Sequence, residues 1–201
     1  MKEHSFAFKH HFVSAYIRGM QTAWLLDIPG AKWVIDDRFC EKDGGIFHEL
    51  HPDEAEEYRK RFKNRAHELD PYRSRPERGQ SFFDLETSVR PAIEPLPTSS
   101  LVVCHGHLIR VIDHMIMKGE NSWHMKSLWD SEWQIPNCGL IEYTKKSPKT
   151  GHISENLFWR RMSDPCQDRL GEWEQITRPR YDNDALKILI DEVLGRLSQE
   201  S

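Results

Sequence analysis

The sequence lacks any long apolar run, any cysteine cluster and any strong excess of one charge. No apolar stretch approaches the roughly 18 residues that a membrane span needs. Residues 1–12 contain His and Lys but no apolar core like that of a signal peptide. The net charge of −4 gives no general attraction for nucleic acid or for an anionic membrane. We therefore expect a cytoplasmic protein that binds neither.

Cysteine is sparse, and its spacing argues against the usual cysteine chemistries. The 4 cysteines show no C-x-x-C spacing: Cys40, Cys104, Cys138 and Cys166. This fits separate thiols in a reducing compartment better than disulfides or a zinc site. Two histidine pairs could each provide half a metal site, His48 with His51 or His105 with His107. Neither has an evident third ligand nearby, so we expect no metal ion.

Length and composition predict one globular domain over residues 1–201. Apolar residues make up 38% and charged residues 30% of the 201 positions, and we find no repeat or linker-like stretch. Hydrophobic periodicity predicts strands over residues 8–14, 32–36 and 101–104, helices over 16–27, 52–69, 81–93 and 107–118, a C-terminal helix, and an antiparallel pair from 138–144 and 155–161. Strands alternating with helices indicate an α/β fold: a three-layer α/β/α sandwich with a mostly parallel sheet.

For two of these elements the sequence also predicts how far they are buried or exposed to solvent. The apolar strand at 101–104 is typical of a strand buried on both faces. The charged helix at 52–69 has Glu56/Lys60 and Glu57/Arg61 at i,i+4 spacing, which indicates a solvated face.

Two strand–turn–helix junctions carry residues suited to phosphate. Ser14 ends one predicted strand, and Arg18 follows in the first turn of a helix. The second junction is Cys104-His105-Gly106, where the apolar strand gives way to a helix. Anions bind at the carboxyl ends of strands in open α/β sheets, and the arginine fork binds phosphate oxygens bidentately. A guanidinium and an imidazole could therefore converge on one phosphate.

Four stretches, in order, resemble the motifs of the histidine phosphatase superfamily, the phosphoglycerate-mutase-like proteins. They are S-x-x-x-R-x-x-x-T-A at 14–23, R-F-C-E-K-D-G-G at 38–45, G-Q-S-F-F-D at 79–84 and V-V-C-H-G at 102–106. The stretch W-Q-I-P-N-C-G-L-I-E-Y-T at 133–144 is similar to a late strand of phosphatase members. Gln80 stands where the family usually has Glu, and Cys104 where it has Ser or Thr.

The resemblance implies phosphoryl transfer from a phosphomonoester through a phosphohistidine. It implies Arg18 as a phosphate clamp, His105 as a second imidazole stabilising the transferring group, and Glu41 as the proton donor. It also implies a small phosphorylated substrate or a phosphoprotein, no metal or organic cofactor, and a homodimer as a possible assembly. The segment 47–80 is expected to form part of a lid over the pocket.

The family's nucleophile lies in an Arg-His-Gly motif that this sequence does not contain. Only 13 residues precede Ser14, too few for a further strand, loop and helix, so we expect a domain without its first strand and helix and with an open slot in its sheet. Loss of a nucleophile can cost roughly a millionfold in rate.

Four hypotheses therefore stand. The first is a phosphatase whose recorded start is too late or whose gene is split. The second is a phosphate-ligand-binding relative without turnover. The third is a nucleophile relocated to His4, His10 or His11. The fourth is a plain protein-interaction module.

Overall fold

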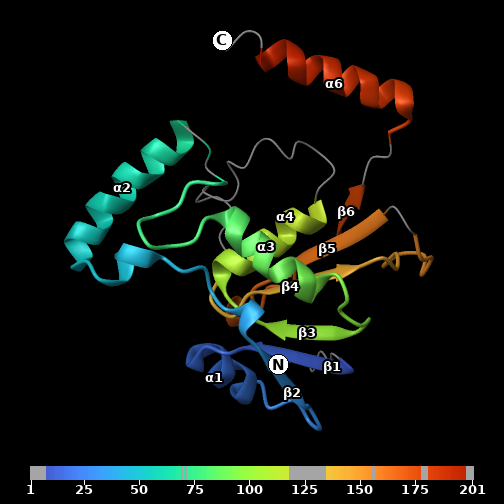
Figure 1. Ribbon diagram of the computed structural model, residues 1–201. Helices are drawn as coiled ribbons and strands as arrows, with labels where there is room; N and C mark the ends of the chain where they lie inside the picture. Colours follow the sequence, from blue (N-terminus) through green and yellow to red (C-terminus); the bar gives the residue numbers. More distant parts are fainter. Residues whose placement is uncertain are drawn as a thin grey trace. The chain divides into compact units, whose positions relative to one another are not determined.

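The computed structural model describes residues 8–68, 70, 72–117, 135–154, 157–177 and 181–197 (Figure 1). These residues fall into two compact units, one covering the chain up to Ile116 and the other running from Pro136 onward. The expectation of one domain over residues 1–201 stays a prediction.

The first unit is built on a parallel sheet of three strands in the order β2-β1-β3. The strands are β1 (His10–Ser14), β2 (Trp33–Asp36) and β3 (Ser100–Val103). In the register of the sheet, Phe12 lies opposite both Val34 and Val102. The connecting elements are α1 (Ile17–Leu25), η1 (Asp37–Phe39), η2 (Gly45–His48), α2 (Pro52–Glu68), α3 (Phe82–Ile93) and α4 (Gly106–Met117).

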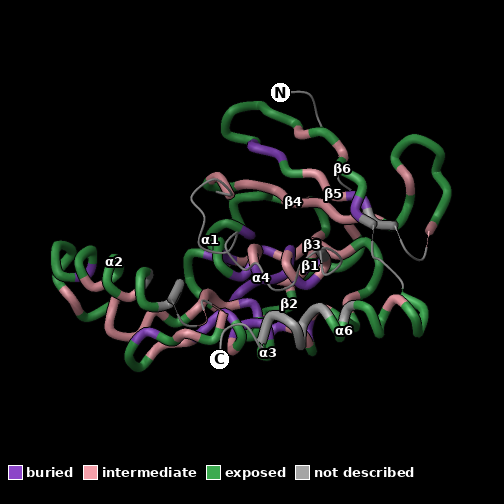
Figure 2. Tube along the Cα trace, turned by 90° about the horizontal axis from the view of Figure 1, so that it is seen from above, coloured by how far each residue is buried: buried purple, intermediate pink, exposed green. Residues whose placement is uncertain are grey.

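Helices cover both faces of this sheet, because successive strand residues point to opposite sides. Val13 of β1 packs with Val103 of β3 against Ala23 of α1. Phe12 and Val102, one position earlier on each strand, pack on the other side against a core of α3 and α4 residues. Figure 2 shows the buried stretches of this unit gathered around β1, β3, α3 and α4. The predicted α/β fold with a parallel sheet between helices is confirmed.

The burial expected for β3 is wrong in part. Val103 is buried, but Leu101 and Val102 are only partly so. The reason is the place of β3 in the sheet: in the part of the chain that the structure describes, β1 pairs with one edge of β3 and no strand pairs with the other. A strand at a sheet edge keeps part of its side-chain area and one row of backbone groups accessible.

Helices α2 and α3 begin and behave as their sequences predict. Glu56 and Lys60 of α2 lie 4.0 Å apart and Glu57 and Arg61 lie 3.6 Å apart, all four well exposed, so the solvated face is confirmed. At the start of α3, Ser81 Oγ accepts the backbone N–H of Asp84 at 3.1 Å. The Asp84 carboxylate accepts the N–H of Ser81 at 2.8 Å. This reciprocal capping box fixes where α3 starts.

The second unit is an antiparallel sheet in the order β4-β5-β6. Its elements are β4 (Leu140–Thr144), β5 (Leu157–Ser163), η3 (Pro165–Gln167), β6 (Glu174–Thr177) and α6 (Asn183–Leu197). The predicted antiparallel pair is confirmed, with Tyr143 opposite Arg160, whereas β6 was not predicted. In neither unit does a described helix have both the length and the apolarity that crossing a membrane requires.

Candidate active site

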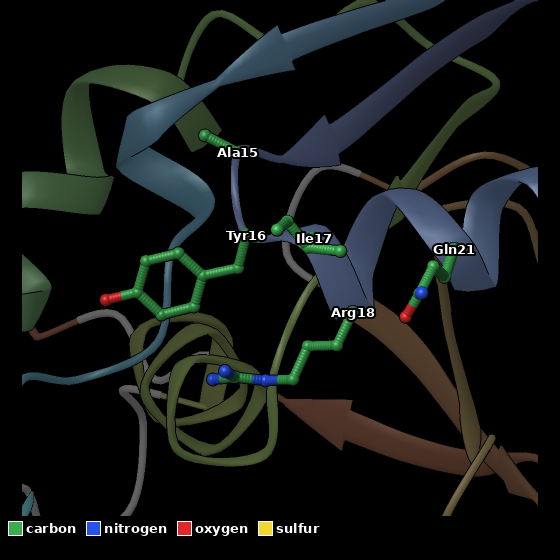
Figure 3. A pocket seen from close by; sticks show the side chains of 5 residues that line it. All are labelled: Ala15, Tyr16, Ile17, Arg18 and Gln21. Carbon is green, nitrogen blue, oxygen red and sulfur yellow. The ribbon is translucent and has the colours of Figure 1, made fainter.

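The turn between β1 and α1 places Arg18 at the carboxyl end of the parallel sheet. Ser14 ends β1, and its Oγ accepts the backbone N–H of Tyr16 at 3.2 Å, which sets the turn into α1. Arg18 lies in the first turn of α1, where its side chain and that of Tyr16 border a hollow of about 560 Å³ (Figure 3). The guanidinium carbon lies 4.7 Å from the centre of the Tyr16 ring.

His105 follows β3 and meets Arg18 from the neighbouring strand end. The residue is 7% exposed. Nδ1 of His105 accepts a hydrogen bond from Nε of Arg18 at 3.2 Å, and Nε2 lies 2.7 Å from Oγ of Ser14. The Tyr16 ring is tilted against the imidazole, with centroids 5.3 Å apart. The structure thus brings together the two residues that the sequence analysis placed at separate junctions.

The charge state of His105 follows from these contacts. Burial lowers the pKa of His105, the positive charge of Arg18 lowers it further, and Glu41 opposes both. The net result is a neutral imidazole at neutral pH, with both nitrogens engaged by the protein. Among the described residues, no acceptor contacts the two Nη groups of Arg18. The two Nη groups of the guanidinium are therefore free donors of the site.

Glu41 lies on the loop after η1 and faces the N-terminal end of α4. Its Oε1 accepts the backbone N–H of Lys42 at 2.9 Å, and its Oε2 lies 3.4 Å from Nδ1 of His107. Burial raises the pKa of Glu41, but the hydrogen bond and charge of His107 and the two backbone N–H groups outweigh it and lower the pKa overall. The resting form is therefore a carboxylate.

Lys42 and Gln80 hold the Glu41 loop against the chain that leads into α3. The Lys42 ammonium donates to the backbone carbonyl of Gln80 at 2.9 Å, and burial lowers the pKa of Lys42. The Gln80 side-chain carbonyl accepts the N–H of Asp43 at 3.0 Å. Gln80, a departure from the family's usual Glu, thus keeps an acceptor where a carboxylate would offer one.

The same two loops cross at Gly45. The residue has φ +55°, and a Cβ added there would lie 2.2 Å from the carbonyl oxygen of Glu77. The neighbouring N–H of Ile46 donates to that oxygen at 2.9 Å. Only glycine permits both the left-handed backbone and this approach.

His107 and Ser14 are site residues whose contacts the sequence analysis did not predict. His107 stands two positions after His105 in the same junction, a signal that was available from the sequence. Ser14 was noted only as the end of a predicted strand and the start of a motif. Its contact with His105 spans 91 positions, and no local pattern reveals such a pairing.

Two of the three histidines considered as relocated nucleophiles do not reach this site. His10 and His11 lie at the start of β1, about 10–13 Å along the strand from Ser14 at the rise of a parallel strand. His11 is buried beside Trp33, with ring centroids 5.3 Å apart. His4 lies outside the described residues.

Neither predicted half-site for a metal gains a third ligand within the described ranges. No group of three His, Cys, Asp or Glu side chains there is arranged to hold a metal ion. His48 instead accepts the N–H of Gly44 at 3.3 Å, and His107 faces Glu41.

Comparisons with known proteins identify similar structures and a matching family. The α-ribazole phosphatase of Shigella flexneri has a similar fold, with a TM-score of 0.51 and 14% identity over 88% of this chain and 78% of its own. Mycobacterial hydrolase 2 is 18% identical over 90% of this chain and 75% of its own, with a TM-score of 0.47. No curated protein gives a significant match. The family model for branch 1 of the histidine phosphatase superfamily matches residues 2–151, most of the chain. This protein therefore belongs to the histidine phosphatase superfamily.

Proposed function

We propose that the site around Arg18 is the phosphate end of a pocket for phosphatase-type phosphoryl transfer on a phosphomonoester. Membership of the histidine phosphatase superfamily supports phosphatase-type chemistry on small phosphorylated substrates. The observation that carries the proposal is the free pair of Nη groups on a guanidinium whose Nε is fixed to His105 at 3.2 Å. A fixed arginine fork matches two phosphate oxygens.

Glu41 is the proposed proton donor to the leaving oxygen. In the resting site it is ionised, held so chiefly by His107 against the effect of burial. A phosphate dianion bound at Arg18 adds negative charge near Glu41, which raises the pKa of its carboxyl group. Binding would therefore move Glu41 toward the protonated form that general acid catalysis needs.

A second candidate function is the binding of a phosphorylated ligand or phosphoprotein without turnover. The observation that favours it concerns the histidine beside Arg18, which offers no free ring nitrogen to attack a phosphoryl group. His105 is committed on both nitrogens. The two functions share one phosphate site and differ only in the chemical step.

The test measures binding and hydrolysis on the same purified chain. Binding of inorganic phosphate is followed by calorimetry, and hydrolysis with an aryl phosphate. Arg18→Ala should weaken phosphate binding about 10- to 100-fold, the loss expected for hydrogen bonds to a charged group. Arg59→Ala, which removes an exposed arginine paired with Glu56 on α2, is the matched control and should leave binding unchanged.

The outcomes separate the candidates. Phosphate binding with hydrolysis, in this chain or only in a version extended at its N-terminus, supports the phosphatase. Binding without hydrolysis in either version supports the second candidate. Equal phosphate affinity of the wild type and Arg18→Ala would contradict both candidate functions. The remaining hypothesis would then be the protein-interaction module.

A further inference from the structure

Ser14 is a fully buried residue to which the proposed chemistry gives no task. It is 0% exposed at the end of β1. Its Oγ has three neighbours: the N–H of Tyr16 at 3.2 Å, Nε2 of His105 at 2.7 Å and Sγ of Cys40 at 3.5 Å. A hydroxyl has one proton to donate and two lone pairs to accept with, so three neighbours fill its capacity.

The proton positions in this cluster follow from one group that can only donate. Nε of Arg18 always carries its hydrogen, so Nδ1 of His105 is an acceptor and bears no proton. A neutral imidazole then carries its single proton on Nε2, which donates to Ser14. The hydroxyl proton of Ser14 is left to point at the Cys40 sulfur. Each hydrogen has one place in the chain of bonds.

We propose that Ser14 is a positioning residue: by accepting the Nε2 hydrogen of His105, it stabilises the imidazole tautomer that Arg18 requires, whose Nδ1 lone pair fixes the guanidinium. The proposal rests on the proposed function to the extent that Arg18 is the phosphate-binding group. Ser14 acts through His105 and touches no substrate. The network also excludes a serine nucleophile, because His105 could accept the Ser14 proton only at a nitrogen that already carries one.

The electrostatic setting favours the same arrangement. Protonation of His105 would put a hydrogen on Nδ1, facing the N–H of Arg18, and would break the bond between them. Burial and the charge of Arg18 lower the pKa of His105, while Glu41, the acidic group that acts on it, raises it by less. The neutral ring that the network requires is therefore the resting form.

The primary test is the tautomer of His105 in the full chain. Long-range hydrogen–nitrogen correlation spectra of protein labelled with nitrogen-15 histidine distinguish protonated from bare ring nitrogens. The wild type should show a protonated Nε2 and a bare Nδ1. Ser14→Ala should shift the ring toward a mixture of tautomers. Cys40→Ala is the matched control, because it removes the acceptor of the Ser14 hydroxyl and leaves the His105 bond intact.

Two results would overturn the proposal. One is a wild-type spectrum with the proton on Nδ1, which decides the matter even if Ser14→Ala fails to fold. The other is a folded Ser14→Ala variant whose His105 spectrum is unchanged.

Phosphate affinity provides the second readout. Ser14→Ala should raise the Kd for inorganic phosphate about 2- to 10-fold, the loss of one neutral hydrogen bond, with Cys40→Ala close to the wild type. If the tautomer responds as expected but neither Ser14→Ala nor Arg18→Ala changes phosphate affinity, the proposed function fails while the positioning of His105 by Ser14 stands.

Discussion

Oε2 of Glu41 lies 3.4 Å from Nδ1 of His107, so the carboxylate proposed as proton donor is tied to the first turn of the helix that follows His105. This contact links the loop after η1 with the β3–α4 junction. It also fixes the charge of Glu41, because His107 outweighs the cost of burying a carboxylate.

The Glu41 carboxylate should contribute stability above its ordinary pKa of 4.5 and lose that contribution in acid. Its pKa is lowered by folding, so the unfolded chain takes up the proton first as the pH falls. At neutral pH, Glu41→Gln should lower the free energy of unfolding by about 1–2 kcal/mol. Urea denaturation at neutral pH and at about pH 3 should show this difference shrinking on acidification. The control is the exposed Glu57→Gln on α2.

A difference between wild type and Glu41→Gln that grows in acid would contradict the stabilisation of the Glu41 carboxylate by His107. It would mean that the folded protein holds the protonated form of Glu41.

His105 should make stability depend on pH in a higher window. Its ordinary pKa is 6.5, and burial together with Arg18 lowers it in the folded protein. The unfolded chain therefore binds the proton first, and the contribution of neutral His105 is present above 6.5 and lost as the pH falls through the lower, folded value. The free energy of unfolding of the wild type, measured relative to His105→Gln, should therefore decrease as the pH falls below 6.5. A relative stability that rises as the solution is acidified would show that the folded state prefers the imidazolium.

The capping box of α3 offers a test by double mutation. Ser81→Ala should lower the free energy of unfolding by about 1 kcal/mol, the usual cost of losing an N-cap side chain. Asp84→Ala removes the reciprocal bond and the pairing of Asp84 with Arg75 at 2.5 Å. Since the two residues share their bonds, the double variant should lose less than the sum of the single losses. Strict additivity in chemical denaturation would show that the box is not formed in solution.

Gly45 and Gly30 separate backbone strain from steric overlap. Both have positive φ, +55° and +74°, but a Cβ at Gly30 meets nothing within 4 Å. Gly30→Ala should therefore cost only the strain of a left-handed backbone, about 1–2 kcal/mol. Gly45→Ala adds the overlap with Glu77 and should cost about 2–5 kcal/mol. Thermal unfolding of the two variants tests this, and equal losses would rule out a close crossing at Gly45.

The sequence predicted those parts of the fold that depend on local patterns. Periodicity located α1 to α4 to within a few residues, and Ser81, a residue type favoured at the N-cap, was placed at the start of the helix over 81–93. β6 was missed because Glu174–Thr177, E-Q-I-T, has no clear alternation of apolar and polar residues. The partial exposure of Leu101 and Val102 could not be predicted either, since it depends on which strands lie beside β3.

The candidate site, too, could be predicted from the sequence only in part. Motif spacing pointed to Arg18, Glu41 and His105. The structure places Arg18 against His105, and Glu41 on a loop that contacts the N-terminal end of α4. Their catalytic roles stay predictions. The proton arrangement could not be predicted, because it depends on two atoms of one imidazole facing Ser14 and Arg18.

The close contact between Gly45 and Glu77 holds together the two ends of a long segment of the chain that contains α2. Because the two ends are pinned together, residues can be inserted or deleted between them at a small entropic cost that grows only slowly with loop length. Such changes would lengthen or shorten the segment between Gly45 and Glu77 without displacing the loop that carries Glu41, which immediately precedes it. The protein can therefore vary the size of this segment over evolutionary time while the geometry of the carboxylate beside α4 stays constant.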